Sequence, residues 1–206
     1  MTLEYTRIMI SGYKNQEQND CKKYSHNCHS GRRKRKMRTL IAYFSRAGEN
    51  YFGGSIKNIT VGNTEICANL IKEFLDADVF KIEMKKPYSD QYRECVAQAK
   101  IDFTENSRPE LVKLPENMEA YDTLILGYPN YCGTIPMAVA TFLESFDSYG
   151  KKILPFCTNE GSGMGKSEAM LKKLCPGADI AKGKSITGSQ AKSSKAELEA
   201  WVKQSE

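Results

Sequence analysis

Short apolar segments alternate with amphipathic helical segments through residues 37–206, and this alternation limits the possible folds more than any other feature. The apolar runs at 40–44, 124–127 and 153–157 are short and continuous, which is typical of strands buried on both faces. Buried strands separated by helices indicate a parallel sheet with helices on either side. The sequence therefore predicts a three-layer, doubly wound α/β domain.

The helices between these strands are visible as repeats of apolar residues at helical spacing. In the first helix, Ile66, Leu70, Ile71 and Phe74 share one face, and the preceding residues can cap its start. Weaker strands are expected at 79–83 and within 178–186. The helices are expected at residues 63–76, with Asn63 or Thr64 as the cap, and at 92–103, 137–146, 164–174 and 195–203.

The positive charge of the chain is concentrated at its start. Residues 1–36 hold nine Lys/Arg against three Asp/Glu, whereas the remainder is close to neutral although the whole chain carries +5. We expect residues 1–36 to be a disordered basic extension, or sequence upstream of a start at Met37, followed by one domain at 37–206. The extension also contains four residues too closely spaced for a typical zinc site, Cys21, His26, Cys28 and His29.

Cysteine usage and hydropathy indicate the compartment. The chain has seven cysteines, and Cys67 and Cys157 fall inside apolar patterns, so free thiols are expected rather than a disulfide framework. No apolar run is long enough to span a membrane, and no signal peptide is recognisable. These features predict a cytoplasmic protein.

Three polar, glycine-containing loops follow the three predicted buried strands. In doubly wound folds, ligands bind beyond the carboxyl ends of the strands. The first loop, 45–64, ends at a helix start, where Ser45, Gly62 and Thr64 would suit a phosphate group. An ordinary capped helix would explain the same residues.

The second and third loops, 128–136 and 158–163, could enclose a flat ring. The second has aromatic and amide side chains for stacking and hydrogen bonding, and the third has glycines that let the backbone approach a ligand. Each could also be a simple turn or a flexible linker. Because all three loops follow strands of one parallel sheet, they predict one crevice with a phosphate at one end and a planar ring at the other.

In combination, these segments resemble the flavodoxin-like family. The similarity lies in residues 40–45 with 62–65, in 127–136, in 158–163 and in 183–189, and it covers about residues 37–204. The resemblance implies a five-stranded parallel sheet with strand order 2-1-3-4-5 and FMN as the cofactor. An insertion at about 49–61 divides the phosphate loop of this chain.

The resemblance also implies which residues contact FMN. Those expected at the phosphate are Ser45, Arg46, Gly48, Asn50, Asn63 and Thr64. Those expected on one side of the ring are Pro129, Asn130, Tyr131, Cys132 and Gly133. Those expected on the other side are Thr158, Asn159, Glu160, Gly161, Ser162 and Gly163.

In this interpretation FMN carries the redox chemistry and the protein orients it. No side chain is expected to act as a catalytic acid or base, since the domain contains no His. A carboxylate at Glu160 is expected to lower the reduction potential of a nearby ring. Cys132 is expected to be a small packing residue rather than a reactive thiol.

Three functions fit the sequence. The first is an electron-transfer protein that serves redox partner proteins or a small electron acceptor, as a monomer or homodimer. The second is an FMN-dependent reductase that oxidises NAD(P)H and reduces quinone-type acceptors. The third, ranked below these, is a flavin-free interaction protein that binds nucleic acid through its basic extension.

Overall fold

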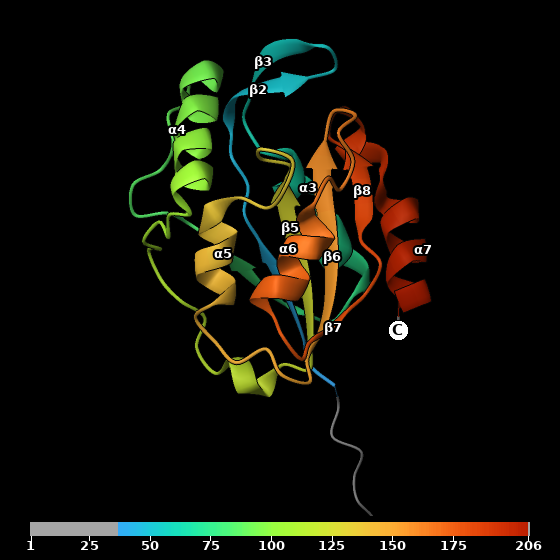
Figure 1. Ribbon diagram of the computed structural model, residues 1–206. Coiled ribbons are helices and arrows are strands. Elements are labelled where there is room, and N and C mark those ends of the chain that lie inside the picture. The colour runs from blue at the N-terminus through green and yellow to red at the C-terminus, as the bar shows by residue number, and fades with distance from the viewer. Residues whose placement is uncertain (1–36, 206) are drawn as a thin grey trace, which may run out of the picture. The chain divides into compact units, whose positions relative to one another are not determined.

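A computed structural model describes residues 37–205 of the chain, which form a parallel sheet covered by helices on both faces (Figure 1). The strands lie in the order β4, β1, β5, β6 and β7, and β8 also pairs with β6. Their bounds are β1 Thr39–Tyr43, β4 Asp78–Lys81, β5 Thr123–Pro129, β6 Lys152–Asn159, β7 Asp179–Ile180 and β8 Lys184–Thr187. The basic extension, with its Cys and His residues, lies outside the described residues.

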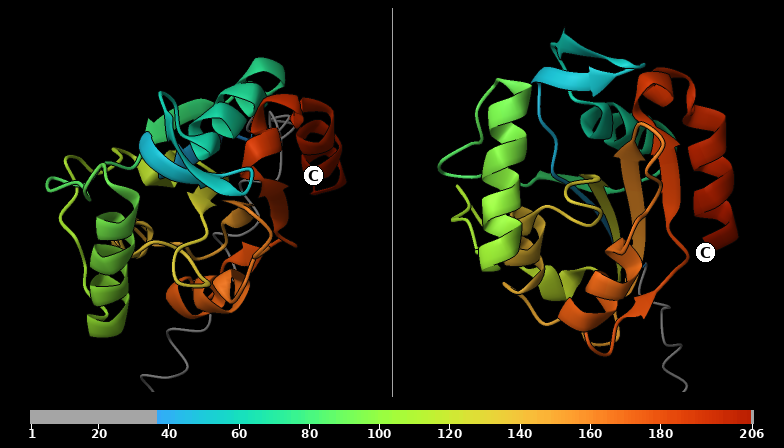
Figure 2. Two further views of the ribbon diagram at one scale, coloured as in Figure 1. Left: turned by 90° about the horizontal axis from the view of Figure 1, so that it is seen from above. Right: turned by 45° about the horizontal axis from the view of Figure 1, so that its top comes forward.

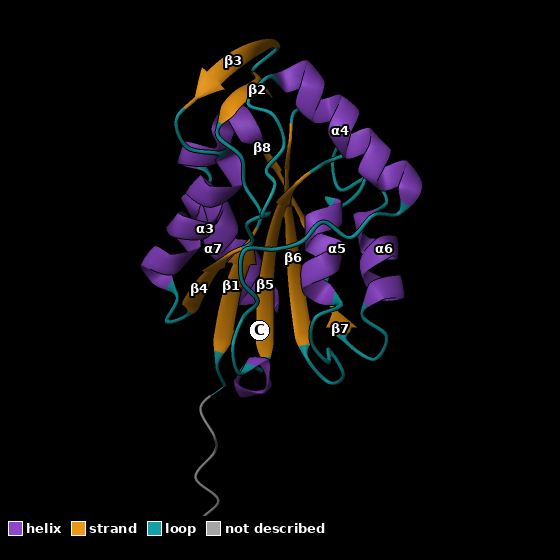
Figure 3. Cartoon of the chain, turned by 90° about the vertical axis from the view of Figure 1, so that its left-hand side faces the viewer, coloured by secondary structure: helices purple, strands orange, loops and turns teal. Residues whose placement is uncertain are grey.

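Side chains of the central strands alternate between two cores. Along β1, Leu40 and Ala42 pack into the first core, and Ile41 and Tyr43 pack into the second. Helices α4, α5 and α6 cover the first face, and α3 and α7 cover the second (Figure 3). The helices are α3 Asn63–Phe74, α4 Tyr92–Glu105, α5 Met137–Leu143, α6 Ser167–Leu174 and α7 Lys195–Ser205, with 3-10 helices η1 Met118–Ala120 and η2 Gly188–Ser193. None of the helices described within residues 37–205 has the length and apolar character to cross a bilayer.

The expected order of five strands holds, but the fifth is divided into β7 and β8. The backbone carbonyls of Lys151 and Ile153 accept hydrogen bonds from Asp179 and Ala181, so alternate residues of β6 face this edge. Pro155 is the next residue that faces it, and it has no backbone N–H to donate. The edge strand therefore breaks opposite Pro155 and pairs again from Lys184 onward.

The segment expected as a long loop before the first helix contains an antiparallel hairpin. Strands β2 (Gly48–Phe52) and β3 (Ser55–Ile59) pair with each other and are separate from the main sheet. Helix α3 then begins at the expected residue, but neither Asn63 nor Thr64 caps it. The N-cap position is Gly62, which has no side chain to donate or accept.

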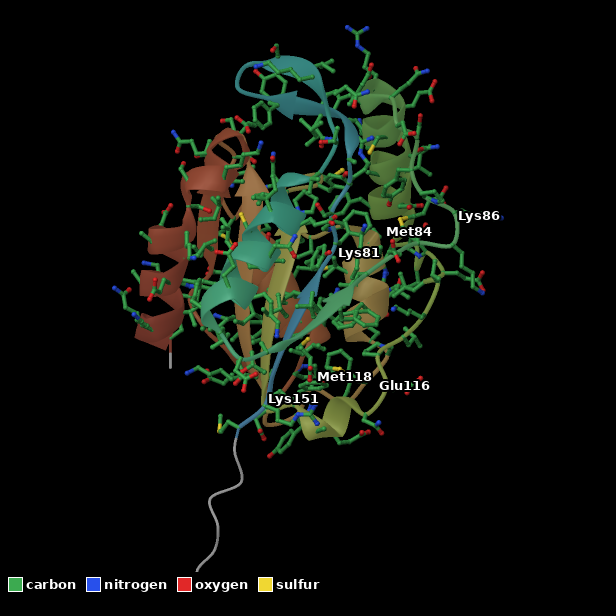
Figure 4. The ribbon with its side chains drawn as sticks, turned by 180° about the vertical axis from the view of Figure 1, so that it is seen from behind. Lys81, Met84, Lys86, Glu116, Met118 and Lys151 are labelled. Atoms are coloured by element: carbon green, nitrogen blue, oxygen red, sulfur yellow. The ribbon has the colours of Figure 1, made fainter. Side chains whose placement is uncertain are left out.

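At the amino ends of the strands, a buried lysine holds the segment around η1 by hydrogen bonds. The Nζ group of Lys151 donates to the carbonyl oxygens of Met118 and Tyr121, each at 2.8 Å. Figure 4 shows Lys151 and Met118 together at this end of the sheet. Because the side chain is only 9% exposed, these carbonyls have little access to water that could replace the ammonium group.

Replacing Lys151 by Met should lower the free energy of unfolding by about 1–3 kcal/mol, because two buried carbonyls lose their donor. Urea denaturation monitored by circular dichroism would measure the change. Lys152→Met is the control, because the side chain of Lys152 is half-buried and makes no such hydrogen bond in the described structure. Equal stabilities for the two variants would contradict this role for Lys151.

Candidate functional site

Residues at the carboxyl ends of β1, β5 and β6 line a cleft. The hairpin lies above these strand ends (Figure 2). The volume of the cleft is about 230 Å³. This is slightly below the range of roughly 300–1,000 Å³ that is usual for small-molecule sites, so a ligand as large as a nucleotide would also contact its rim. The lining residues are Ser45, Arg46, Asn50, Tyr51, Asn63, Thr64, Tyr92, Pro129, Asn130, Tyr131, Thr158, Asn159, Glu160, Ser162 and Gly188.

The structure brings together residues from all three loops that the sequence singled out. The predicted residues that do not line the cleft are Gly48, Cys132, Gly133, Gly161 and Gly163. Three lining residues were not predicted, namely Tyr51, Tyr92 and Gly188. Tyr51 belongs to the unexpected hairpin, and Tyr92 is the first residue of α4.

The first loop places a hydroxyl group at the start of α3. The first N–H groups of a helix need acceptors from outside it, and the Oγ of Ser45 accepts from the N–H of Glu65 at 3.1 Å. A Cβ at Gly62 would overlap this Oγ and lie 2.6 Å from the carbonyl oxygen of Arg46. Glycine is thus required here for close approach rather than for a special conformation, since its φ is −68°.

The first and third loops are joined by two buried threonines. The hydroxyls of Thr64 and Thr158 lie 2.8 Å apart, and both side chains are almost inaccessible to solvent. Only one of the two protons is used in the bond between them. The pair therefore fixes the distance between the loops and keeps one hydroxyl proton available beside the cleft.

Arg46 is held by the protein backbone. Its terminal nitrogens donate to the carbonyl oxygens of Ser89, Asp90 and Glu49. Its Nε is buried and has no hydrogen-bond partner within the described residues. Asn50 likewise donates to backbone carbonyls of the same loop, including that of Gly48 at 3.2 Å. Both residues line the cleft, but most of their polar atoms shape the loop.

The second loop turns sharply, and its aromatic ring packs against the core at the edge of the cleft. Cys132 and Gly133 both have positive φ, 52° and 77°, and Tyr131 and Thr134 exchange backbone hydrogen bonds across them, as in a type I′ turn. The ring of Tyr131 packs at 6.1 Å from both Phe44 and Tyr88. Burial and the nearby Cys95 thiol raise the pKa of Tyr131, so its hydroxyl stays protonated.

The third loop is organised by two side chains. The Oδ1 of Asn159 accepts from the N–H groups of Gly161 and Gly163, at 2.9 and 2.8 Å. The carboxylate of Glu160 accepts from the backbone N–H of Gly53, and from the N–H and hydroxyl of Ser189. Its expected effect on a reduction potential stays a prediction.

Burial raises the pKa of four thiols of the described domain, namely those of Cys67, Cys132, Cys157 and Cys175. Partial burial raises the pKa of Cys132, and only the more distant Lys100 acts against it. Burial also raises the pKa of Cys67 to about 11 and that of Cys157 to about 12. A reactive thiol needs a lowered pKa, whereas that of Cys132 is raised. Because Cys132 is exposed and does not line the cleft, the packing role expected of it stays a prediction.

A family model described as flavodoxin matches residues 38–205, which is most of the chain. The chain belongs to the flavodoxin family. None of the curated proteins with which it was compared matches it.

Solved structures share the fold of this flavodoxin-family chain. A protein from Bacteroides eggerthii classed as a flavoprotein is 24% identical with a TM-score of 0.66, over 82% of this chain and 97% of that one. One from Bacteroides uniformis, classed likewise, is 27% identical with a TM-score of 0.64, over 81% and 98%. A Lactobacillus acidophilus flavoprotein solved with FMN is 17% identical with a TM-score of 0.59, over 81% and 99%.

Replacing Gly62 by Ala should destabilise this flavodoxin-family domain by about 1–3 kcal/mol, because the new Cβ overlaps Ser45 and the backbone of Arg46. Chemical denaturation would measure the loss. Val61→Ala, at the exposed neighbouring residue, should change stability by less than about 0.5 kcal/mol. A neutral Gly62→Ala variant would contradict the close approach.

Replacing Cys132 by Asn should stabilise the domain by about 0.5–1 kcal/mol, because Asn tolerates positive φ better than Cys. Thermal unfolding would show the gain. Cys132→Ala is the control, since it removes the thiol but retains the backbone strain. If Cys132→Ala gave the same gain, the thiol rather than the turn would be responsible.

Proposed function

We propose that this chain binds FMN in the cleft and acts as an electron-transfer protein. The observation that carries the proposal is the convergence of three strand-end loops on one cleft, with the start of α3 at its side. Flavodoxin-family neighbours, including one solved in complex with FMN, support FMN as the cofactor.

The donors at the start of α3 suit a phosphate group. Ser45 Oγ already accepts from the N–H of Glu65, so its own proton is free to be donated to an anion. Asn63 and Thr64 line the cleft within the first turn, where the helix dipole favours negative charge. Arg46 also lines the cleft and places a positive charge beside these donors. These groups would hold the phosphate of FMN.

The other loops suit the ring of FMN. Pro129, Asn130 and Ser162 also line the cleft, and Asn130 is fixed by its hydrogen bond to the carbonyl oxygen of Gly163 at 2.9 Å. When bound, FMN would supply the redox chemistry. The residues of the chain bind and orient it, and no acid or base from the chain is needed to pass electrons.

The electron-transfer protein, or carrier, and the FMN-dependent reductase differ in where their electrons come from. We propose redox partner proteins or a small acceptor as the other reactants, and a cytoplasmic setting in keeping with the free thiols of the described domain. A nucleic-acid function would depend on the basic extension, which lies outside the described residues. The proposed carrier should oxidise NADH or NADPH slowly on its own, whereas rapid steady-state oxidation would favour the reductase.

Purified protein mixed with FMN and desalted should retain flavin absorbance near about 370 and 450 nm. Ser45→Ala should weaken FMN binding about tenfold or more, because a hydrogen bond to a charged group is worth about 1.5–3 kcal/mol. Ser205→Ala is the control, since that hydroxyl bonds only within α7, to the carbonyl of Trp201. Failure of the unaltered protein to bind FMN would overturn the proposed function.

A further inference from the structure

The hairpin is positioned to cover the cleft. Figures 1 and 2 show β2 and β3 above the carboxyl ends of the main strands, between α4 and the segment that follows β8. Its two-residue turn, Gly53-Gly54, has positive φ at both residues, 59° and 88°. This is the tight hairpin turn whose twist matches the paired strands, so the hairpin can act as one stiff unit.

The hairpin brings an aromatic side chain to the cleft, next to another from α4. The rings of Tyr51 and Tyr92 lie with their centroids 6.4 Å apart and their planes tilted by 34°. Both residues line the cleft. The Glu49 carboxylate accepts from the backbone N–H of Tyr92 at 3.0 Å, which ties the hairpin to the first turn of α4. Tyr51 remains 45% exposed, so much of its ring is free for contact.

The strand-end loops supply only one aromatic side chain of their own. Tyr131 is the only aromatic residue among those predicted to contact the ring, and although it lines the cleft, its ring also packs against Phe44 and Tyr88. Its hydroxyl contacts the thiol of Cys95 at 3.6 Å, and its neighbour Cys132 has no ring. A flat, apolar ligand ring gains affinity from an aromatic side chain that it can stack on.

The hairpin is also fixed from the far side of the cleft. One carboxylate oxygen of Glu160 accepts from the N–H of Gly53 at 3.2 Å and from the hydroxyl of Ser189 at 3.1 Å. The other accepts from the N–H of Ser189 at 2.6 Å. Gly188 allows this approach, since a Cβ there would lie 3.0 Å from Glu160 and would overlap the side chain of Asn63. Glu160 therefore joins the third loop, the hairpin turn and η2.

We propose that Tyr51 and Tyr92 form the aromatic wall on which the isoalloxazine ring of FMN stacks, and that Glu160 latches the hairpin so that Tyr51 stays in place. The inserted hairpin thus builds the part of the ring site that the second loop leaves incomplete. This inference rests on the proposed FMN binding and identifies a part of that site that the strand-end loops do not provide.

The wall is tested by measuring FMN dissociation constants. Tyr51→Ala and Tyr92→Ala should each weaken binding about tenfold through loss of stacking and buried area, whereas Tyr51→Phe should stay within about twofold because it keeps the ring. Tyr149→Ala, at a tyrosine 78% exposed on another loop, is the control and should leave affinity unchanged.

The outcomes separate the two proposals. If the unaltered protein binds no FMN, the proposed function falls. If it binds FMN and both alanine variants bind equally well, this inference alone is overturned. Tyr51 is on an exposed hairpin, so its variant tests the wall even if Tyr92→Ala prevents α4 from folding correctly.

The latch is tested without any ligand. Lys57 is the only Lys or Arg between residues 48 and 59, so tryptic cleavage after it reports how often the hairpin opens. In Glu160→Gln an amide nitrogen replaces one carboxylate oxygen and cannot accept hydrogen bonds. The hairpin should then open more often, and trypsin should cut after Lys57 several-fold faster. Glu199→Gln is the control, since that carboxylate pairs with Lys203 on α7. Equal cleavage of Glu160→Gln and unaltered protein would overturn the latch.

Discussion

Each residue of the chain from Leu40 to Phe44 is buried, on one face of the sheet or the other. Such a strand needs cover on both faces, which is typical of a parallel sheet with helices on either side. The polar segments that follow β1, β5 and β6 are then forced to the same edge. At the opposite edge, the buried Lys151 donates hydrogen bonds to the backbone carbonyls of Met118 and Tyr121. The position of the cleft is therefore a consequence of how the core is buried.

This dependence explains why the fold could be predicted from the sequence. Apolar runs such as Ile153–Cys157 specify strand and core at once, because few other structures bury five successive residues. Most residues of the predicted site also line the cleft, since the end of a strand fixes where its loop begins. The exceptions, such as Gly161 and Gly163, shape the third loop through their N–H bonds to Asn159.

Other features depend on contacts between distant parts of the chain, which the spacing of apolar residues does not reveal. The hairpin had a local signal, the Gly53-Gly54 pair between two short runs, but as an insertion it looked like a loop. The division of the fifth strand depends on the direction in which Pro155 faces, which follows only from the register of β6. One side of Tyr131 packs against the core because Phe44 and Tyr88, from distant parts of the chain, contact its ring.

The charged side chains of the cleft follow a common pattern. Arg46 donates to three backbone carbonyls, and Glu160 accepts from two backbone N–H groups and a hydroxyl. Dipoles directed at a charge in this way offset part of its field, so each residue influences a ligand less than a free charge would. Their contribution to a flavin site is therefore mainly to hold loops and hairpin in place, and the affinity for a ring depends on the aromatic surface that this framework positions.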